Sequence, residues 1–149
     1  MFRTAIYVTG LVLALGTSAH AELVRKQSPH PANETMDRLE SAIKQRGLTV
    51  VARVDHASAA KKAGLELRPT ELIIFGNPAV GTPLMQVQQT MGLSLPLKAL
   101  TWQDEMGQVW LGYDEPKDMA AARDVPADHP VLKKIGDALN GLAEEVTKK

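Results

Sequence analysis

The spacing of apolar residues along the chain changes several times, and the clearest pattern is helical. Over residues 130–146, Leu132, Ile135, Leu139, Leu142 and Val146 follow one another at intervals of three and four residues, the spacing of one helix face. We expect this helix to lie with its apolar stripe on one face of a sheet. An earlier helix is predicted after Pro31, with Asn33 as its N-cap and Gly47 as its stop.

Other segments have the shorter period of strands. Residues 48–55 alternate, which predicts Leu48, Val50, Ala52 and Val54 on one face and Thr49, Val51, Arg53 and Asp55 on the other. Residues 71–75 read as a more buried strand, and a short strand is expected at 22–26. Residues 97–103 and 108–113 predict a hairpin. It contains both tryptophans, Trp102 and Trp110, and one of the two tyrosines, so the hairpin is expected to contribute heavily to the core.

Shorter helices are predicted between and after these strands. An Ala-rich helix is expected at 57–63, ending at Gly64, and another at 117–123. Thr82 is the predicted N-cap of a further helix, with Pro83 at its first position. The predicted fold is therefore α+β: one antiparallel sheet of four to five strands with helices on one face. The other face would be polar or free to meet a second subunit.

The N-terminus has the three-part pattern of a secretion signal. Arg3 precedes an apolar run over residues 5–16, and small residues follow, ending in Ala19-His20-Ala21. The run is shorter than the ~20 residues that a membrane-spanning helix needs. We therefore expect residues 1–21 to be removed and residues 22–149 to form a single domain, free of the membrane, in the periplasm or the medium.

Composition limits the classes of partner. The chain has 17 Lys and Arg against 17 Asp and Glu, and loss of Arg3 would leave one excess acidic residue. Nucleic acid and anionic lipid require a clustered basic excess, so neither is expected as a partner. The chain has no cysteine, which excludes disulfides and means that the hydrophobic core must be sufficient for stability.

Five ordered motifs resemble the domain-of-unknown-function 302 family. They are Val54-Asp55-His56, the run from Leu72 to Pro78, the run from Gly81 to Met85, Leu95-Pro96-Leu97, and the run from Val109 to Tyr113 with Pro116. The resemblance covers roughly residues 33–140. It implies a β-α-β(4)-α-like topology with short inserted helices, similar to the folds of TATA-box-binding proteins without their DNA binding. The resemblance carries no catalytic residues with it.

Asp55 and His56, at the end of a strand, are one candidate site. An imidazole that titrates near neutrality beside an orienting carboxylate suits acid–base or metal chemistry. The simpler interpretation is that Asp55 caps the helix that follows it. The histidines have no metal-ligand spacing, so no metal site is predicted from them, and the methionines are explained better as core filler than as ligands of copper or haem iron.

Asn77 and Thr82 are the second candidate, in a loop that runs from a strand into a helix. Free N–H groups at such a place can hold an anion or a carboxylate, although a tight turn before a capped helix explains the same residues. Two hypotheses follow. The first is a non-catalytic module that binds a small molecule or assembles as a homodimer through its sheet or aromatic hairpin. The second is an enzyme, or a metal- or haem-binding protein, that uses His56 with Asp55 and Asn77; no particular cofactor is indicated.

Overall fold

The fold is seen in a computed structural model that describes residues 21–149; the predicted signal peptide, apart from Ala21, lies outside the described residues. Five antiparallel strands form one sheet in the order β1-β5-β4-β3-β2. The strands are β1 (Leu23–Ser28), β2 (Thr49–Asp55), β3 (Thr70–Gly76), β4 (Leu97–Gln103) and β5 (Val109–Asp114). The predicted α+β class and antiparallel sheet are confirmed.

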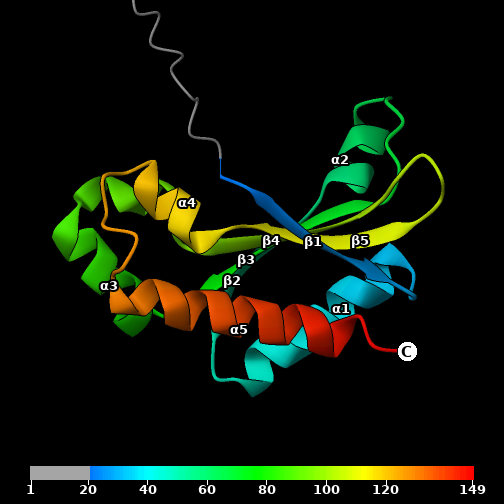
Figure 1. Ribbon diagram of the computed structural model, residues 1–149. Helices are drawn as coiled ribbons and strands as arrows, with labels where there is room; N and C mark the ends of the chain where they lie inside the picture. The colour runs from blue at the N-terminus through cyan, green and yellow to red at the C-terminus, as the bar shows by residue number, and fades with distance from the viewer. Residues whose placement is uncertain (1–20) are drawn as a thin grey trace, which may run out of the picture.

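Two long helices cover one face of this sheet. Figure 1 shows α1 (Ala32–Gln45) and α5 (Pro130–Val146) on the same side. The shorter helices are α2 (His56–Lys62), α3 (Pro78–Val87), the 3-10 turn η1 (Gln89–Leu93) and α4 (Pro116–Ala121). In the same view α2 rises on the side of the sheet away from α1 and α5, and α3 lies at the opposite end of the molecule. The inserted short helices therefore sit at the ends of the sheet.

The core lies between the sheet and the two long helices. The predicted stripe of α5 is buried along its whole length, and so are the inward residues of α1. The sheet meets them with Ile73, Phe75, Ala99, Leu111 and Tyr113. This arrangement confirms that the C-terminal helix packs its apolar face on the sheet.

A β-bulge in β2 overturns the predicted faces of that strand. Val50 pairs with Phe75, but the next pair is Ala52 with Ile74, so Val51 is an extra residue in the ladder. A bulge of one residue reverses the alternation beyond it. Val50 packs against the core, whereas Arg53, predicted on the other face, is opposite the buried Ile73 and also faces the helices.

The hairpin of β4 and β5 contributes to the core as predicted, through Ala99, Leu111 and Tyr113, but its two tryptophans lie outside the core between the sheet and the helices. Trp102 and Trp110 are cross-strand partners, while their neighbours Thr101 and Leu111 are fully buried on the helix side. Because side chains alternate along a strand, both indoles lie on the face away from α1 and α5. There the Trp110 Nε1–H donates to Asp104 Oδ2 at 2.7 Å, and the Arg25 guanidinium lies 4.8 Å from the centre of the Trp110 ring.

Two predicted helix starts are wrong. The first helix begins at Ala32, because Pro31 takes the extended N-cap position, and Asn33 lies inside the first turn. The helix assigned to Thr82 and Pro83 begins at Pro78 instead. The Asn77 side chain accepts the Ala79 N–H at 2.9 Å and Pro78 fits the first position, so Thr82 and Pro83 fall within α3.

Candidate functional site

A pocket forms where α3 meets the end of the sheet. The start of β2, the end of β3 and the start of β4 enclose it with α3, the loop before β4 and one residue of α5. Its volume is about 380 Å³. The lining residues are Thr49, Val51, Gly76, Asn77, Pro78, Val80, Gly81, Thr82, Met85, Gly92, Leu95, Pro96, Leu97 and Ile135.

The chemistry of this pocket is apolar with a few neutral polar groups. No lining residue is charged, and the polar side chains are those of Thr49, Asn77 and Thr82. Since Asn77 Oδ1 accepts the Ala79 N–H, its Nδ2 is the amide atom left to donate to a bound molecule. Both residues of the second candidate site, Asn77 and Thr82, thus lie on this pocket.

Close packing of α3 on the loop before β4 forms one wall of the pocket. A Cβ on Gly81 would lie 3.3 Å from Leu95 Cδ1, and one on Gly76 would lie 3.6 Å from Pro96 Cβ. The absence of a side chain at Gly81 lets the helix approach Leu95 at this distance. The bulge contributes as well, because the extra residue, Val51, is one of the lining side chains.

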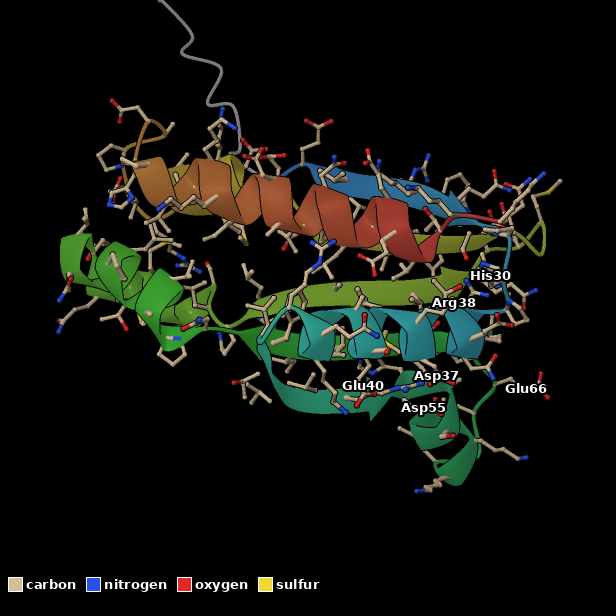
Figure 2. The ribbon with its side chains drawn as sticks, turned by 90° about the horizontal axis from the view of Figure 1, so that it is seen from below. His30, Asp37, Arg38, Glu40, Asp55 and Glu66 are labelled. Carbon is tan, nitrogen blue, oxygen red and sulfur yellow. The ribbon has the colours of Figure 1, made fainter. Side chains whose placement is uncertain are left out.

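Asp55 and His56 lie at the opposite end of β2. The strand runs over seven residues from Thr49, on the pocket, to Asp55, which is about 20 Å at about 3.3 Å per residue. Figure 2 shows Asp55 beside the start of α2, at the other end of the sheet from α3. The four predicted residues therefore belong to two separate sites, and His56 and Asn77 cannot contact the same small molecule.

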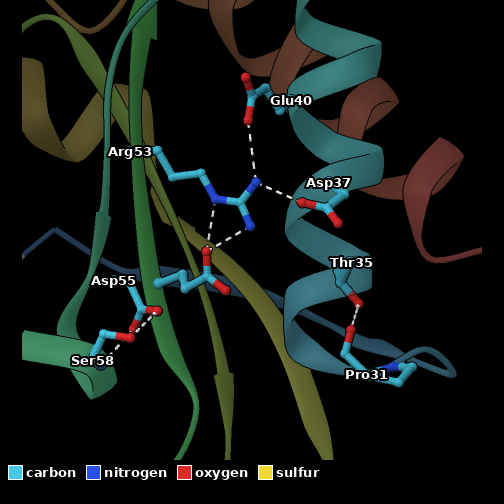
Figure 3. Close-up of polar contacts among 8 residues, drawn as sticks. Pro31, Thr35, Asp37, Glu40, Arg53, Asp55 and Ser58 are labelled. Carbon is cyan, nitrogen blue, oxygen red and sulfur yellow. Dashed lines mark hydrogen bonds and ion pairs between the residues drawn. The ribbon is translucent and has the colours of Figure 1, made fainter. Parts of the chain in front are cut away.

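The side chain of Asp55 caps α2. Its Oδ1 accepts the Ser58 N–H at 2.8 Å and its Oδ2 accepts the Ser58 hydroxyl at 2.7 Å (Figure 3). Both hydrogen bonds lower the pKa of Asp55 below its usual value, and the bond from the Ser58 backbone N–H contributes most. His56 is the exposed first residue of the same helix. The capping interpretation explains Asp55 fully.

The histidines and acidic residues do not gather at one point in the described structure. In residues 21–149 no three His, Cys, Asp or Glu side chains are placed to hold a metal ion. His30 Nε2 lies 2.8 Å from the Lys148 carbonyl, and His129 Nδ1 accepts the Val131 N–H at 3.3 Å at the start of α5. Met91, on the 3-10 turn η1, is fully buried in the core, as expected of a methionine that acts as core filler.

A cluster of charged side chains that the sequence did not indicate joins α1 to the sheet. Arg53 donates through Nε to Glu71 Oε2 at 2.7 Å and through Nη1 to Asp37 Oδ1 at 2.6 Å and Glu40 Oε2 at 3.2 Å (Figure 3). Lys44 also donates to Glu40, and the bonds from Lys44 and Arg53 lower the pKa of Glu40. The bulge places Arg53 here, and bulges leave no periodic signal in a sequence.

None of the helices within residues 21–149 combines the length and the apolar content needed to span a lipid bilayer.

Comparison with known proteins identifies relatives without an assigned activity for this domain. The family model described as "Domain of unknown function DUF302" matches residues 24–146. The crystal structure of an uncharacterized conserved DUF302 protein from Bacillus stearothermophilus has a TM-score of 0.75 at 21% identity, covering 85% of this chain and 98% of that one. At this identity the likeness is one of fold.

Two curated relatives match over a shorter region. Fluoride-specific ion channel FluC 1 of Brucella suis is 51% identical over 98 residues, which are 66% of this chain and 39% of that protein. FluC 1 of Brucella abortus has the same identity over the same number of residues, 36% of its length. The chain therefore spans well under half the length of these relatives.

Proposed function

The chain belongs to the DUF302 family, and we propose that it is a non-catalytic binding module that takes a small, neutral, largely apolar molecule in the pocket beside α3. The observation that carries this proposal is the uncharged lining of a cavity of about 380 Å³. Pockets that enclose small molecules usually measure about 300–1,000 Å³ and combine apolar walls with a few polar groups.

The lining favours a neutral ligand. A charged group brought into this pocket would lose its hydration and find no side chain of opposite charge, which is costly. A hydroxyl, amide or carbonyl group on the ligand would instead meet Asn77 Nδ2 or the hydroxyls of Thr49 and Thr82. We therefore expect one polar end on the ligand and an apolar body against residues such as Met85 and Leu95.

The same lining favours binding over catalysis. It contains no carboxylate, imidazole, ammonium or thiol, and its only side-chain hydroxyls belong to threonines. General acid–base catalysis requires a titratable group within hydrogen-bond reach of the reacting atom. The titratable residue of the sequence hypothesis, His56, lies at the far end of β2.

Export is part of the proposal. The leader-like pattern from Arg3 to Ala21 supports a mature domain free in the periplasm or the medium. Mass spectrometry of the protein recovered from the producing cells would show an N-terminus at Glu22. Recovery of the uncleaved chain from the cytoplasm would contradict export and leave the pocket proposal intact.

The fluoride-channel relatives favour a module that works within a larger assembly. In those proteins a stretch 51% identical to part of this chain belongs to a much longer polypeptide. A domain that binds a small molecule and contacts other protein surfaces suits both this chain and the longer polypeptides of those relatives.

A fluorescent apolar probe tests the pocket. N-phenyl-1-naphthylamine, which is neutral, is expected to bind the full chain with enhanced emission, and anionic anilinonaphthalene sulfonate to bind more weakly. Val51→Trp should fill the pocket and weaken binding of the neutral probe by at least about tenfold, a cost of about 1.4 kcal/mol. Val51 is exposed and lines the pocket, so the variant should fold.

Val87→Trp is the matched control. Val87 is also an exposed valine, on α3, but it does not line the pocket. Its substitution should leave probe affinity unchanged. Equal affinity in wild type and Val51→Trp, or equal loss in the two variants, would contradict the proposed site.

A further inference from the structure

A second cavity lies between α5, the start of α4 and the strands β1 and β5, and we call it the α5 groove. Residues within 127–140 form one wall, and Val24, Tyr113, Glu115 and Lys117 form the other. Its volume is about 810 Å³, and it shares no lining residue with the pocket beside α3. Along α5 it extends from Pro130 to Asn140, about 15 Å at about 1.5 Å per residue. The groove is therefore long enough for an extended small molecule.

The hydroxyl of Tyr113 faces this groove without a hydrogen-bond partner. Tyr113 is 6% exposed and belongs to the core, and a buried tyrosine usually finds a partner for its hydroxyl. Within residues 21–149 the side-chain atom that is both fully enclosed and unbonded is Thr101 Oγ1. The Tyr113 Oη, which forms no hydrogen bond in the same part of the chain, is therefore open to the groove. A molecule in the groove would supply the missing partner.

A carboxylate accompanies this hydroxyl. Glu115 is half-buried at the N-cap of α4, and its carboxylate forms no hydrogen bond and no ion pair with the described residues. Burial, and then the charges of Glu115 and Glu144, raise the pKa of Tyr113. The phenol is thus neutral at neutral pH and able to accept a hydrogen bond, and the charges that act on it are negative.

The other charged residues of the groove are exposed and balance one another in sign. They are Lys117, Asp128, Lys133 and Asp137, and Lys133 pairs with Asp137 at 2.7 Å. His129 accepts the Val131 N–H through Nδ1, which assigns the proton to Nε2 and leaves the ring neutral. Glu115 is therefore one uncompensated negative charge at a partly buried position. Such a charge is costly without a partner, and a cation on a ligand would remove that cost.

The middle of the groove is apolar and has space for a hydrocarbon chain. Leu132 is buried and Val24 is half-buried on opposite walls. Gly136 lies in the interior of α5, where glycine weakens a helix. A Cβ at Gly136 would meet no atom within 4 Å outside the backbone of its own helix. The space above Gly136 therefore belongs to the groove and suits the apolar part of a ligand.

We propose that the α5 groove binds an organic ammonium ion, with the ammonium group between the Glu115 carboxylate and Tyr113 Oη and an apolar body over Gly136. The carboxylate and the phenol oxygen each accept an N–H bond, so both unbonded groups gain a partner. A carboxylate on the ligand would instead meet Glu115 with like charge, and a neutral hydroxyl would leave the charge of Glu115 uncompensated. This inference concerns a site separate from the pocket beside α3 and is independent of the proposed function.

Three probes with the same alkyl chain and different ends test the proposal on the full chain: hexylamine, hexanol and hexanoate. At neutral pH the amine is protonated, since its pKa is close to that of lysine, about 10.4. An amide NMR titration should shift the Gly136 signal, with hexylamine binding at least about tenfold more tightly than the other two probes. The Gly81 amide reports the pocket beside α3 in the same spectra, so binding at the two sites is measured separately.

Glu115→Gln and Tyr113→Phe should each weaken hexylamine binding by at least about tenfold, because each loses a hydrogen bond to a charged group. Neither change removes a side-chain bond within residues 21–149, so both variants should fold. Gly136→Leu should fill the groove and have the same effect while favouring the helix. Glu105→Gln is the matched control, since Glu105 is an exposed carboxylate in the hairpin loop and does not line the groove.

A preference for hexylamine that is lost in Glu115→Gln and kept in Glu105→Gln supports the site. Equal shifts of the Gly136 amide with all three probes, or no shift with hexylamine, overturn the proposal. Undiminished affinity in Glu115→Gln overturns it as well, and so does an equal loss in Glu105→Gln, because the preference would then come from the overall charge of the protein. Binding of N-phenyl-1-naphthylamine should be unchanged in all four variants, so a failure here leaves the pocket beside α3 unaffected.

Discussion

Two threonines among residues 21–149, Thr35 and Thr101, are completely buried, and only one of the two has a partner for its hydroxyl. Thr35 Oγ1, on α1, lies 2.7 Å from Ser28 Oγ and donates to the Pro31 carbonyl at 3.0 Å (Figure 3). Thr101 Oγ1, on β4, has no hydrogen-bond partner among the described residues. The same substitution, Thr→Val, should therefore change stability in opposite directions at the two positions.

The magnitudes follow from the hydrogen bonds. Valine replaces the hydroxyl by a methyl of similar size and keeps the branched Cβ that suits a strand. At position 101 it removes a desolvated polar group with no bond, a gain of about 1 kcal/mol. At position 35 it removes two hydrogen bonds and leaves the O–H of the buried Ser28 without its acceptor, a loss of about 1–3 kcal/mol.

Thermal and urea unfolding, followed by circular dichroism, measure both effects. For a domain of this size 1 kcal/mol corresponds to about 4 °C in Tm. We expect Thr101→Val to raise Tm by about 4 °C and Thr35→Val to lower it by at least that much. If Thr101→Val lowers Tm as Thr35→Val does, the unpaired hydroxyl is not a cost and the reasoning is refuted.

Three further predictions concern the charged cluster, the carboxylates and the aromatic face. Arg53→Met should lower the free energy of unfolding by about 1–2 kcal/mol, because Asp37, Glu40 and Glu71 lose their shared cation; urea unfolding of a variant as stable as wild type would contradict this. Hydrogen bonds from neighbouring groups lower the pKa values of three carboxyls in the folded state. The largest contribution comes from Lys44 for Glu40, from Trp110 for Asp104 and from Lys26 for Glu144. The stability that these hydrogen bonds contribute is present above the ordinary carboxyl pKa of about 4 and is lost as pH falls through the lowered pKa values. Urea midpoints should therefore be level near neutrality and decline below about pH 4. Urea midpoints that stay level down to pH 2 would contradict this prediction. Gly112→Ala would place a Cβ 2.9 Å from Trp102 Cζ3, so it should cost about 1–3 kcal/mol and alter the near-ultraviolet circular dichroism, whereas an unchanged spectrum would show that the ring does not lie there.

Local pattern determined most of the elements. The helix predicted over residues 130–146 is α5, and the strand predicted over 97–103 is β4, with the same bounds. Both predictions are confirmed because each element buries one face, and the residues of that face recur at a fixed interval along the chain. Asp55 as a cap and Gly47 as a stop, the latter at φ +69, are equally local.

The candidate site was only partly accessible from the sequence. Asn77 and Thr82 could be found because a strand followed by a turn and a proline predicts a loop that enters a helix. The residues that complete the pocket, such as Val51, Leu95 and Ile135, come from separate elements that only the tertiary fold brings together. The same fold separates His56 from Asn77, a distance that no spacing along the chain expresses.

By itself the sequence determined the α+β class and the order and bounds of most elements, because these depend on propensity and on the period of buried positions; the resemblance to the DUF302 family rests on the five ordered motifs instead. Only the tertiary structure decided which face each strand residue takes and what lies uncovered. One extra residue, Val51, turns Arg53 towards α1 and Val54 towards the uncovered face, and the alternation around Thr101 and Leu111 sets both tryptophans outside the core. The face of the sheet on which a side chain lies is set by the register between strands. Register depends on hydrogen bonds to a segment far away in the sequence, and the pattern of adjacent residues contains no information about that segment.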